Sequence, residues 1–188
     1  LIDDIFRQPG RGLLDANEAV QAQLFKAQVD RNEVTGEKDP TVRLIDFVNP
    51  ERNAFHAINQ FRVDTPGCVK GFIIPDVVLF VNGLPLVVIE AKIGDANTAN
   101  PMHEAFVQLQ RYRDARPETA AAGLREGEPK LFYPNLMVIR TCGEAAEFGT
   151  ISSAPEHFYG WRNIWPERYT EITPPLGVVR PQGELVQG

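Results

Sequence analysis

The 188-residue sequence predicts an α/β (α+β) fold, in which helices flank a mixed, mainly antiparallel central sheet. Two long β-rich segments meet at Asn82-Gly83, and a helical repeat of apolar residues follows them. A hydrophobic fraction of 43% against 23% charged residues is typical of a globular chain with one sizeable core. We therefore expect a single folded domain.

The first elements are predicted to be one helix and two strands. Apolar residues recur at helical spacing over residues 13–31, which predicts an amphipathic helix. Residues 41–48 are rich in β-branched and aromatic side chains and end at Asn49-Pro50, so they predict a strand. Mostly apolar and mostly polar side chains alternate over residues 55–63, which predicts a further strand in a sheet that is only partly buried on one side.

The clearest local signal is a β-hairpin. Residues 72–81 and 84–92 are β-rich and flank Asn82-Gly83, a dipeptide typical of tight hairpin turns. Both segments are almost continuously apolar, which indicates central strands that are covered on both faces. The charged exceptions within them are Asp76, Glu90 and Lys92.

A second helix and another strand are predicted after the hairpin. Asn100 and Pro101 suit the N-cap and first position of a helix that ends near Arg116-Pro117. Residues 135–141 predict a short strand. These elements extend the antiparallel hairpin into a larger sheet with helices beside it.

Composition limits the kinds of protein that this chain can be. Proline and glycine replace any periodicity near the end, so we expect a folded domain over residues 1–166 and a linker over 167–188. The 19 basic and 25 acidic residues give a net charge of −6, which argues against a free-standing nucleic-acid binder. The two cysteines lie far apart and show no Cys-x-x-Cys or His-rich spacing, which argues against a disulfide scaffold and a thiolate zinc site. Short apolar runs and the lack of a signal peptide predict a cytoplasmic protein without a membrane span.

Asp76, Glu90 and Lys92 suggest chemistry, because a charge in a buried strand is unfavourable unless it is paired or bound to a metal. A Glu-x-Lys pair alone is most often a structural ion pair, since residues two apart on a strand share a face. Asp76 adds a second carboxylate from the adjoining strand. Two carboxylates, water and a phosphate oxygen suit Mg²⁺, and a nearby lysine can act on the attacking water. The three residues therefore fit phosphodiester hydrolysis.

Shared metal binding constrains the register of the hairpin. A plain two-residue turn at Asn82-Gly83 would place Asp76 opposite Ile89 and leave Glu90 on the other face. Both carboxylates must lie on one face to share a cation. We therefore predict either a three-residue loop with Gly83 in a left-handed bulge position, or a compensating bulge near Pro75 or Pro85.

The sequence from Pro75-Asp76 to Glu90-Ala91-Lys92 resembles the PD-(D/E)xK nuclease motif. The surrounding residues are similar to the N-terminal endonuclease domain of the restriction (R) subunit of type I restriction-modification enzymes. The similarity covers roughly residues 41–161 and rests on residues 44–47, 49–50, 59–61, 76–92, 104–106, 108–112 and 135–139.

The resemblance implies a restriction-endonuclease-like core and a role for each motif residue. The chain begins at Leu1 and not at Met, so we expect that the start of this domain is missing. Asp76, Glu90 and the backbone carbonyl of Ala91 would bind Mg²⁺, for which Mn²⁺ can substitute. Lys92 would serve the attacking water. Gln108 and Tyr112 match a Gln-x-x-x-Tyr element expected to contact DNA. Apart from the resemblance, Arg111, Arg113 and Arg116 form a basic cluster, which is usually a solvated helix face and is here also the one expected phosphate-facing patch of an acidic chain.

The resemblance also implies partners. These are double-stranded DNA, methyltransferase (M) and specificity (S) subunits, and a helicase-like motor domain that follows the linker and uses ATP. The family usually has Glu-Leu-Lys where this chain has Glu90-Ala91-Lys92, a change that keeps both charges. A further acidic metal ligand on the first helix is usual in such folds, and Glu18 is the only nearby candidate for it in the sequence.

Two other functions stay open at this point. One is a stand-alone PD-(D/E)xK nuclease of another system, which a downstream phosphate-binding loop of a translocase would argue against. The other is a nuclease-like fold that serves only as a docking module, as the acidic composition suggests. His56, His103 and His157 share no metal-ligand spacing and are left out of the site.

Overall fold

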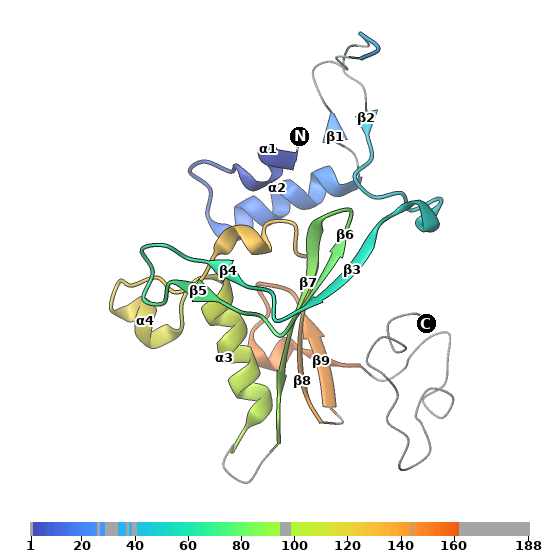
Figure 1. Cartoon of the computed structure of the whole chain (residues 1–188). Coiled ribbons are helices and arrows are strands. Elements are labelled where there is room, and N and C mark those ends of the chain that lie inside the picture. The colour runs from blue at the N-terminus through green and yellow to red at the C-terminus, as the bar shows by residue number, and fades with distance from the viewer. Residues whose placement is uncertain are drawn as a thin grey trace, which may run out of the picture.

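The fold is built around a six-stranded sheet (Figure 1). The computed structural model describes residues 2–25, 27–28, 34–36, 38, 41–94, 99–143 and 145–161. The strands of the sheet are β3 (Phe55–Asn59), β6 (Val77–Val81), β7 (Leu84–Lys92), β8 (Met137–Cys142), β9 (Ala145–Gly149) and β10 (Tyr159–Gly160).

The order of these strands is β10-β9-β8-β7-β6-β3. Strands β7 and β8 are parallel, and the other neighbouring pairs are antiparallel. This confirms the predicted mixed, mainly antiparallel sheet. The long β7 lies in the interior of the sheet between β6 and β8, as its apolar sequence predicts.

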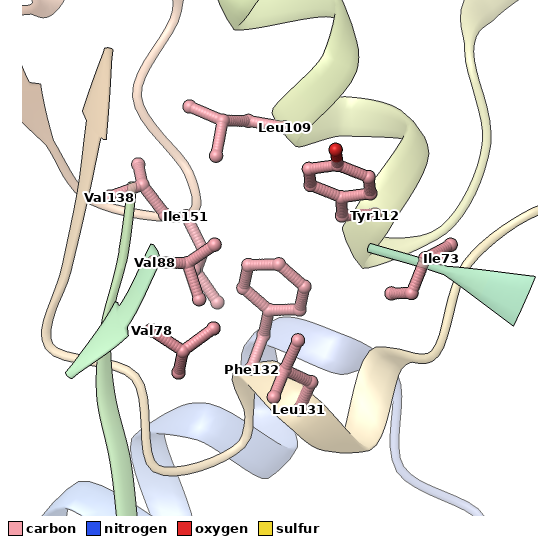
Figure 2. Close-up of a cluster of buried hydrophobic side chains, with 9 residues drawn as sticks. All are labelled: Ile73, Val78, Val88, Leu109, Tyr112, Leu131, Phe132, Val138 and Ile151. Atoms are coloured by element: carbon pink, nitrogen blue, oxygen red, sulfur yellow. The ribbon is translucent and has the colours of Figure 1, made fainter. Parts of the chain in front are cut away.

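Helix α3 (Pro101–Arg113) packs on the sheet against β7 and β8. The Asn100 side chain accepts a hydrogen bond from the backbone N–H of His103 and caps the helix, and Pro101 occupies the first position, as predicted. Between α3 and the sheet lies a hydrophobic core (Figure 2). Its members are Ile73, Val78, Val88, Leu109, Tyr112, Leu131, Phe132, Val138 and Ile151.

A second core lies at the other end of β7, under helices α1 (Ile2–Phe6) and α2 (Leu13–Phe25). The apolar face of α2 contributes Val20 and Leu24, and β7 contributes Leu84 and Leu86. The side-chain amide of Asn17 contacts backbone carbonyls in the segment that leads into β8. The N-terminal helices therefore hold the start of β7 and of β8 in place.

The remaining elements are short. Helix α4 (Pro117–Ala121) follows α3. Two small ladders pair β1 (Ala27–Gln28) with β2 (Thr41–Val42), and β4 (Val63–Asp64) with β5 (Phe72–Ile73). Three 3₁₀ turns cover Pro50–Arg52, Pro129–Phe132 and Pro155–His157.

Two early predictions are too long. The first helix ends at Phe25, because the chain enters β1, and residues 29–31 of the predicted helix lie outside the described residues. The predicted strand over residues 41–48 is reduced to β2, because the carboxylate of Asp46 accepts hydrogen bonds from the backbone N–H groups of Val48 and Asn49 and forms a turn.

Two other predicted strands are interrupted, whereas the prediction over 135–141 is confirmed by β8. The strand predicted over 55–63 ends at Asn59, where Gln60 adopts a left-handed φ of 51°. The segment 72–81 is divided between β5 and β6 around Pro75.

Helices α1 and α4 and strands β9 and β10 have no counterpart in the prediction. The predicted boundary between residues 166 and 167 lies outside the described residues. Within the described part of the chain, no helix is both long and apolar enough to cross a membrane.

Candidate active site

The hairpin of β6 and β7 turns through two residues. Val81 pairs with Leu84 directly across the turn. Both turn residues are left-handed, with φ of 51° at Asn82 and 81° at Gly83, which is the geometry of a type I′ turn. The three-residue loop considered for this position is therefore not the one that the chain adopts.

A β-bulge corrects the register instead. The pairing shifts where Leu79 faces Val87, which gives β7 one extra residue immediately after Pro85. Continuing this register places Asp76 opposite Glu90, and residues directly opposite in an antiparallel pair share a face. The predicted compensating bulge near Pro85 is confirmed, and it brings the two carboxylates together.

Asp76 is held by donors from both neighbouring strands. The side-chain amide of Gln60 donates to Oδ1 over 2.9 Å, and the backbone N–H of Ala91 donates to Oδ2 over 2.9 Å. Each carboxylate oxygen has a second lone pair beyond these bonds. The half-buried carboxylate is thus fixed in orientation while it keeps acceptor capacity for a cation.

Glu90 is almost fully buried, with 2% of its surface exposed. The ammonium of Lys92 donates to Oε1 over 2.5 Å, whereas Oε2 accepts no hydrogen bond from any described residue. Burial raises the pKa of Glu90 and the charge of Asp76 raises it further, whereas Lys92 and, to a smaller extent, the nearby Tyr112 hydroxyl oppose the shift. A buried carboxylate oxygen without a donor is unfavourable, so this atom is suited to a cation.

The donor set fits Mg²⁺. Two carboxylates and the backbone carbonyl of Ala91 are hard oxygen ligands, and Mg²⁺ keeps several waters alongside one or two carboxylates. Among the described residues, no group of three or more His, Cys, Asp or Glu side chains is arranged so that it could hold a metal ion. Glu18 is exposed on α2 and does not form such a group with Asp76 and Glu90.

The Gln-x-x-x-Tyr element of α3 also reaches the site. Tyr112 is 2% exposed, and its hydroxyl donates to the backbone carbonyl of Ile74 over 2.8 Å. Gln108 donates to the same hydroxyl over 3.1 Å. Burial and the negative charges of Glu90 and Asp76 raise the pKa of Tyr112, so the phenol stays neutral. In this conformation the two residues hold the segment before Asp76, and the expected contact with DNA stays a prediction.

The expected basic patch is largely used within the protein. Arg111 is 7% exposed, and its Nε donates to Glu126 over 3.0 Å. Arg116 donates to Glu126 through its backbone N–H and its side chain. These hydrogen bonds are the main cause that lowers the pKa of Glu126 to about 2. Arg113 is half-buried. Arg111 is therefore placed as a buried structural cation and not on the surface as expected.

Glu126, Gln60 and Arg140 are important residues that the sequence did not single out. Arg140 is the parallel-strand neighbour of Glu90, but its guanidinium is bound to Glu147 over 2.8 Å and to a backbone carbonyl. Each of these three residues bonds to a partner that is distant in the sequence or lies on an irregular segment, so no local sequence pattern indicates its role. The one available signal was the presence of Gln60 among the residues that carry the family resemblance.

Comparison with known proteins decides the family. The family described as Type I restriction enzyme R protein N terminus matches residues 1–157. The chain belongs to this family. The match confirms the resemblance seen in the sequence and extends it to the N-terminal helices.

In the relatives that match, this region is a small part of a much longer subunit. The chain is 34% identical over 134 residues to the type I restriction enzyme HindI endonuclease subunit of Haemophilus influenzae. It is 33% identical over 104 residues to the "Putative type I restriction enzyme MjaVIIIP endonuclease subunit" of Methanocaldococcus jannaschii. These matches cover 68% and 53% of the chain but 11% and 10% of the relatives, so the chain spans about a tenth of their length.

Proposed function

We propose that this chain is the nuclease of a type I restriction enzyme R subunit, and that it hydrolyses phosphodiester bonds of double-stranded DNA with Mg²⁺ or Mn²⁺. The observation that carries the proposal is the bulge after Pro85, which sets Asp76 opposite Glu90 while Glu90 Oε2 lacks a donor among the described residues. A structural ion pair between Glu90 and Lys92 requires neither the second carboxylate nor the open oxygen.

Each residue has a distinct role in this proposal. Asp76, Glu90 and the carbonyl of Ala91 would hold the metal. When bound, Mg²⁺ offsets charge on the phosphate and makes a water more acidic. Lys92, whose side chain is 28% exposed beside Glu90, would orient the attacking water and offset negative charge in the transition state. Tyr112 keeps the backbone before Asp76 in position through Ile74.

Other functions of the enzyme would lie outside this chain. We expect ATP to act only through a helicase-like motor domain elsewhere in the subunit, and recognition to come from the M and S subunits. A net charge of −6 and the internal pairing of Arg111 and Arg116 fit DNA that is delivered by these partners. The cytoplasm is the compartment expected for such a complex.

The alternatives are less well supported. Relatives named as endonuclease subunits, of which this chain matches about a tenth, argue against a stand-alone nuclease. A docking module without activity does not explain why Asp76, Glu90 and Lys92 converge on one face of the sheet.

Removal of Asp76 tests the proposal. In the full-length subunit without nucleotide, Asp76→Ala should abolish Mn²⁺ binding at this site in a calorimetric titration, and plasmid cleavage by the assembled enzyme should fall with it. Asp64→Ala removes an exposed carboxylate on β4 and is the matched control, for which no change is expected. Mn²⁺ affinity and cleavage that survive in Asp76→Ala would rule the proposal out.

A further inference from the structure

We propose that Gln60 is a positioning residue for the carboxylate of Asp76, a role that rests on the proposed function. Gln60 lies at the end of β3, one position beyond the last residue paired with β6. Its side-chain amide donates to Asp76 Oδ1 over 2.9 Å. Gln60 would therefore set the orientation in which Asp76 meets the metal, without touching the metal itself.

The backbone of Gln60 is the first independent observation. Its φ of 51° lies in the left-handed region, which glycine adopts freely and which asparagine tolerates. A long side chain in this conformation is uncommon, and such residues gather at functional sites. Gln60 is also exposed, so packing in the core does not account for it.

The hydrogen bonds around Asp76 are the second observation. The backbone N–H of Gln60 donates to the Asp76 carbonyl over 2.8 Å, so the main chains of the two residues are already joined. The side-chain bond therefore adds little to strand pairing. The Gln60 side chain binds Oδ1 of Asp76 and the backbone N–H of Ala91 binds Oδ2, so each carboxylate oxygen is held by one donor. Hydrogen bonds to a ligating carboxylate are the usual means by which a protein orients it.

Asn82 offers a matched comparison. It has the same φ of 51°, but its side chain bonds to Leu44, Ala54 and Asn53 beside the hairpin turn and not to a site residue. Glycine at either position relieves the strain of the left-handed backbone conformation and removes one side chain with its hydrogen bonds. The two replacements should therefore separate a role in the site from a role in the fold.

The test uses the full-length subunit and Mn²⁺ as the probe, with calorimetric titration and thermal unfolding of the metal-free protein. Gln60→Gly should weaken Mn²⁺ binding by roughly 10–100-fold, as expected for the loss of a bond to a ligand. Its melting temperature should stay within about 4 °C of wild type, since the strain that is relieved offsets the bond that is lost. Gln60→Asn, which tolerates the backbone but is one methylene shorter, should show the same weakening.

The control should behave in the opposite way. Asn82→Gly should lower the melting temperature and leave the Mn²⁺ dissociation constant unchanged. Plasmid cleavage by the assembled enzyme should be reduced in Gln60→Gly at limiting Mn²⁺ and recover at high Mn²⁺, whereas Asp76→Ala should not recover. Recovery by mass action is a property of a weakened site and not of a missing ligand.

Two results would overturn the role of Gln60. One is an unchanged Mn²⁺ dissociation constant in Gln60→Gly, and the other is an equal loss of affinity in Asn82→Gly. In either case, loss of binding in Asp76→Ala would leave the proposed nuclease intact. Wild-type binding in Asp76→Ala would instead refute the proposed metal site itself, so the two failures are distinguishable.

Discussion

Glu90 and Glu126 are both fully buried carboxylates, yet their surroundings are opposite. Arg116 and Arg111 surround Glu126 with donors, and the hydrogen bonds from Arg116 are the main cause that lowers the pKa of Glu126 to about 2. Glu90 has one ammonium partner, and burial raises its pKa. A carboxylate whose lone pairs are filled stabilises the fold, whereas one with an open oxygen costs stability and retains binding capacity. We read Glu126 as structural and Glu90 as functional on this basis.

Glu126 predicts an acid-dependent contribution to stability. Its folded pKa of about 2 lies below the ordinary 4.5, so the contribution is fully present above pH 4.5 and is lost as the pH falls toward 2. This contribution to the free energy of unfolding is about 3 kcal/mol. Glu126→Gln should lower the free energy of unfolding in urea by that order at pH 7, with a gap to wild type that narrows as the pH falls below 4. A gap that is the same at every pH would contradict the assignment.

At the scale of elements, the bulge in β7 decides whether the two carboxylates meet. Insertion of one alanine after Leu86 would shift the register beyond the bulge by one residue, so that Asp76 faces Ile89 and Glu90 moves to the other face. We expect the insertion variant to lose Mn²⁺ binding. Leu86→Ala keeps the extra residue and should lose about 2–5 kcal/mol of stability from the core with Mn²⁺ binding retained. Calorimetry on both variants, with circular dichroism to verify folding, would contradict us if the insertion variant bound Mn²⁺ as tightly as Leu86→Ala.

The elements also show what sequence patterns could and could not predict. The Asn-Gly turn and the capped helix α3 rest on local rules and were predicted correctly. The need for Asp76 and Glu90 to share a face predicted a register correction, but its location depends on how the whole strand pairs. The strand expected over residues 41–48 failed because the Asp46 side chain satisfies backbone donors locally, an alternative that composition does not reveal.

Tertiary pairing explains the remaining errors at the site. Arg111 is 15 residues before Glu126 in the chain, and Glu126 lies in an irregular segment without a pattern. An arginine cluster on a helix therefore looked available for phosphate when two of its members were already bound. Gln60 and Asp76 meet across strands, so their hydrogen bond also had no local signature.

At the scale of the whole molecule, charge predicts how the chain meets DNA. It carries 19 basic and 25 acidic residues, and Arg111 and Arg116 are engaged with Glu126. We expect the 188-residue chain to bind a DNA duplex weakly, with affinity that falls steeply as salt rises, because few phosphates can be neutralised. Fluorescence anisotropy over a salt titration measures this. Nanomolar binding that is insensitive to salt would contradict delivery of the DNA by partner subunits.

The central claim is that Glu90 and Lys92 form an active site and not a structural ion pair. The most direct measurement is a calorimetric Mn²⁺ titration of Glu90→Ala and Lys92→Ala in the full-length subunit, beside plasmid cleavage by the assembled enzyme. Glu90→Ala should lose both metal binding and cleavage. Lys92→Ala should keep the metal, bound slightly more tightly without the neighbouring positive charge, and still lose cleavage, while ATP-driven translocation persists in both. Equal Mn²⁺ affinity in the two variants, or undiminished cleavage by Lys92→Ala, would contradict the account.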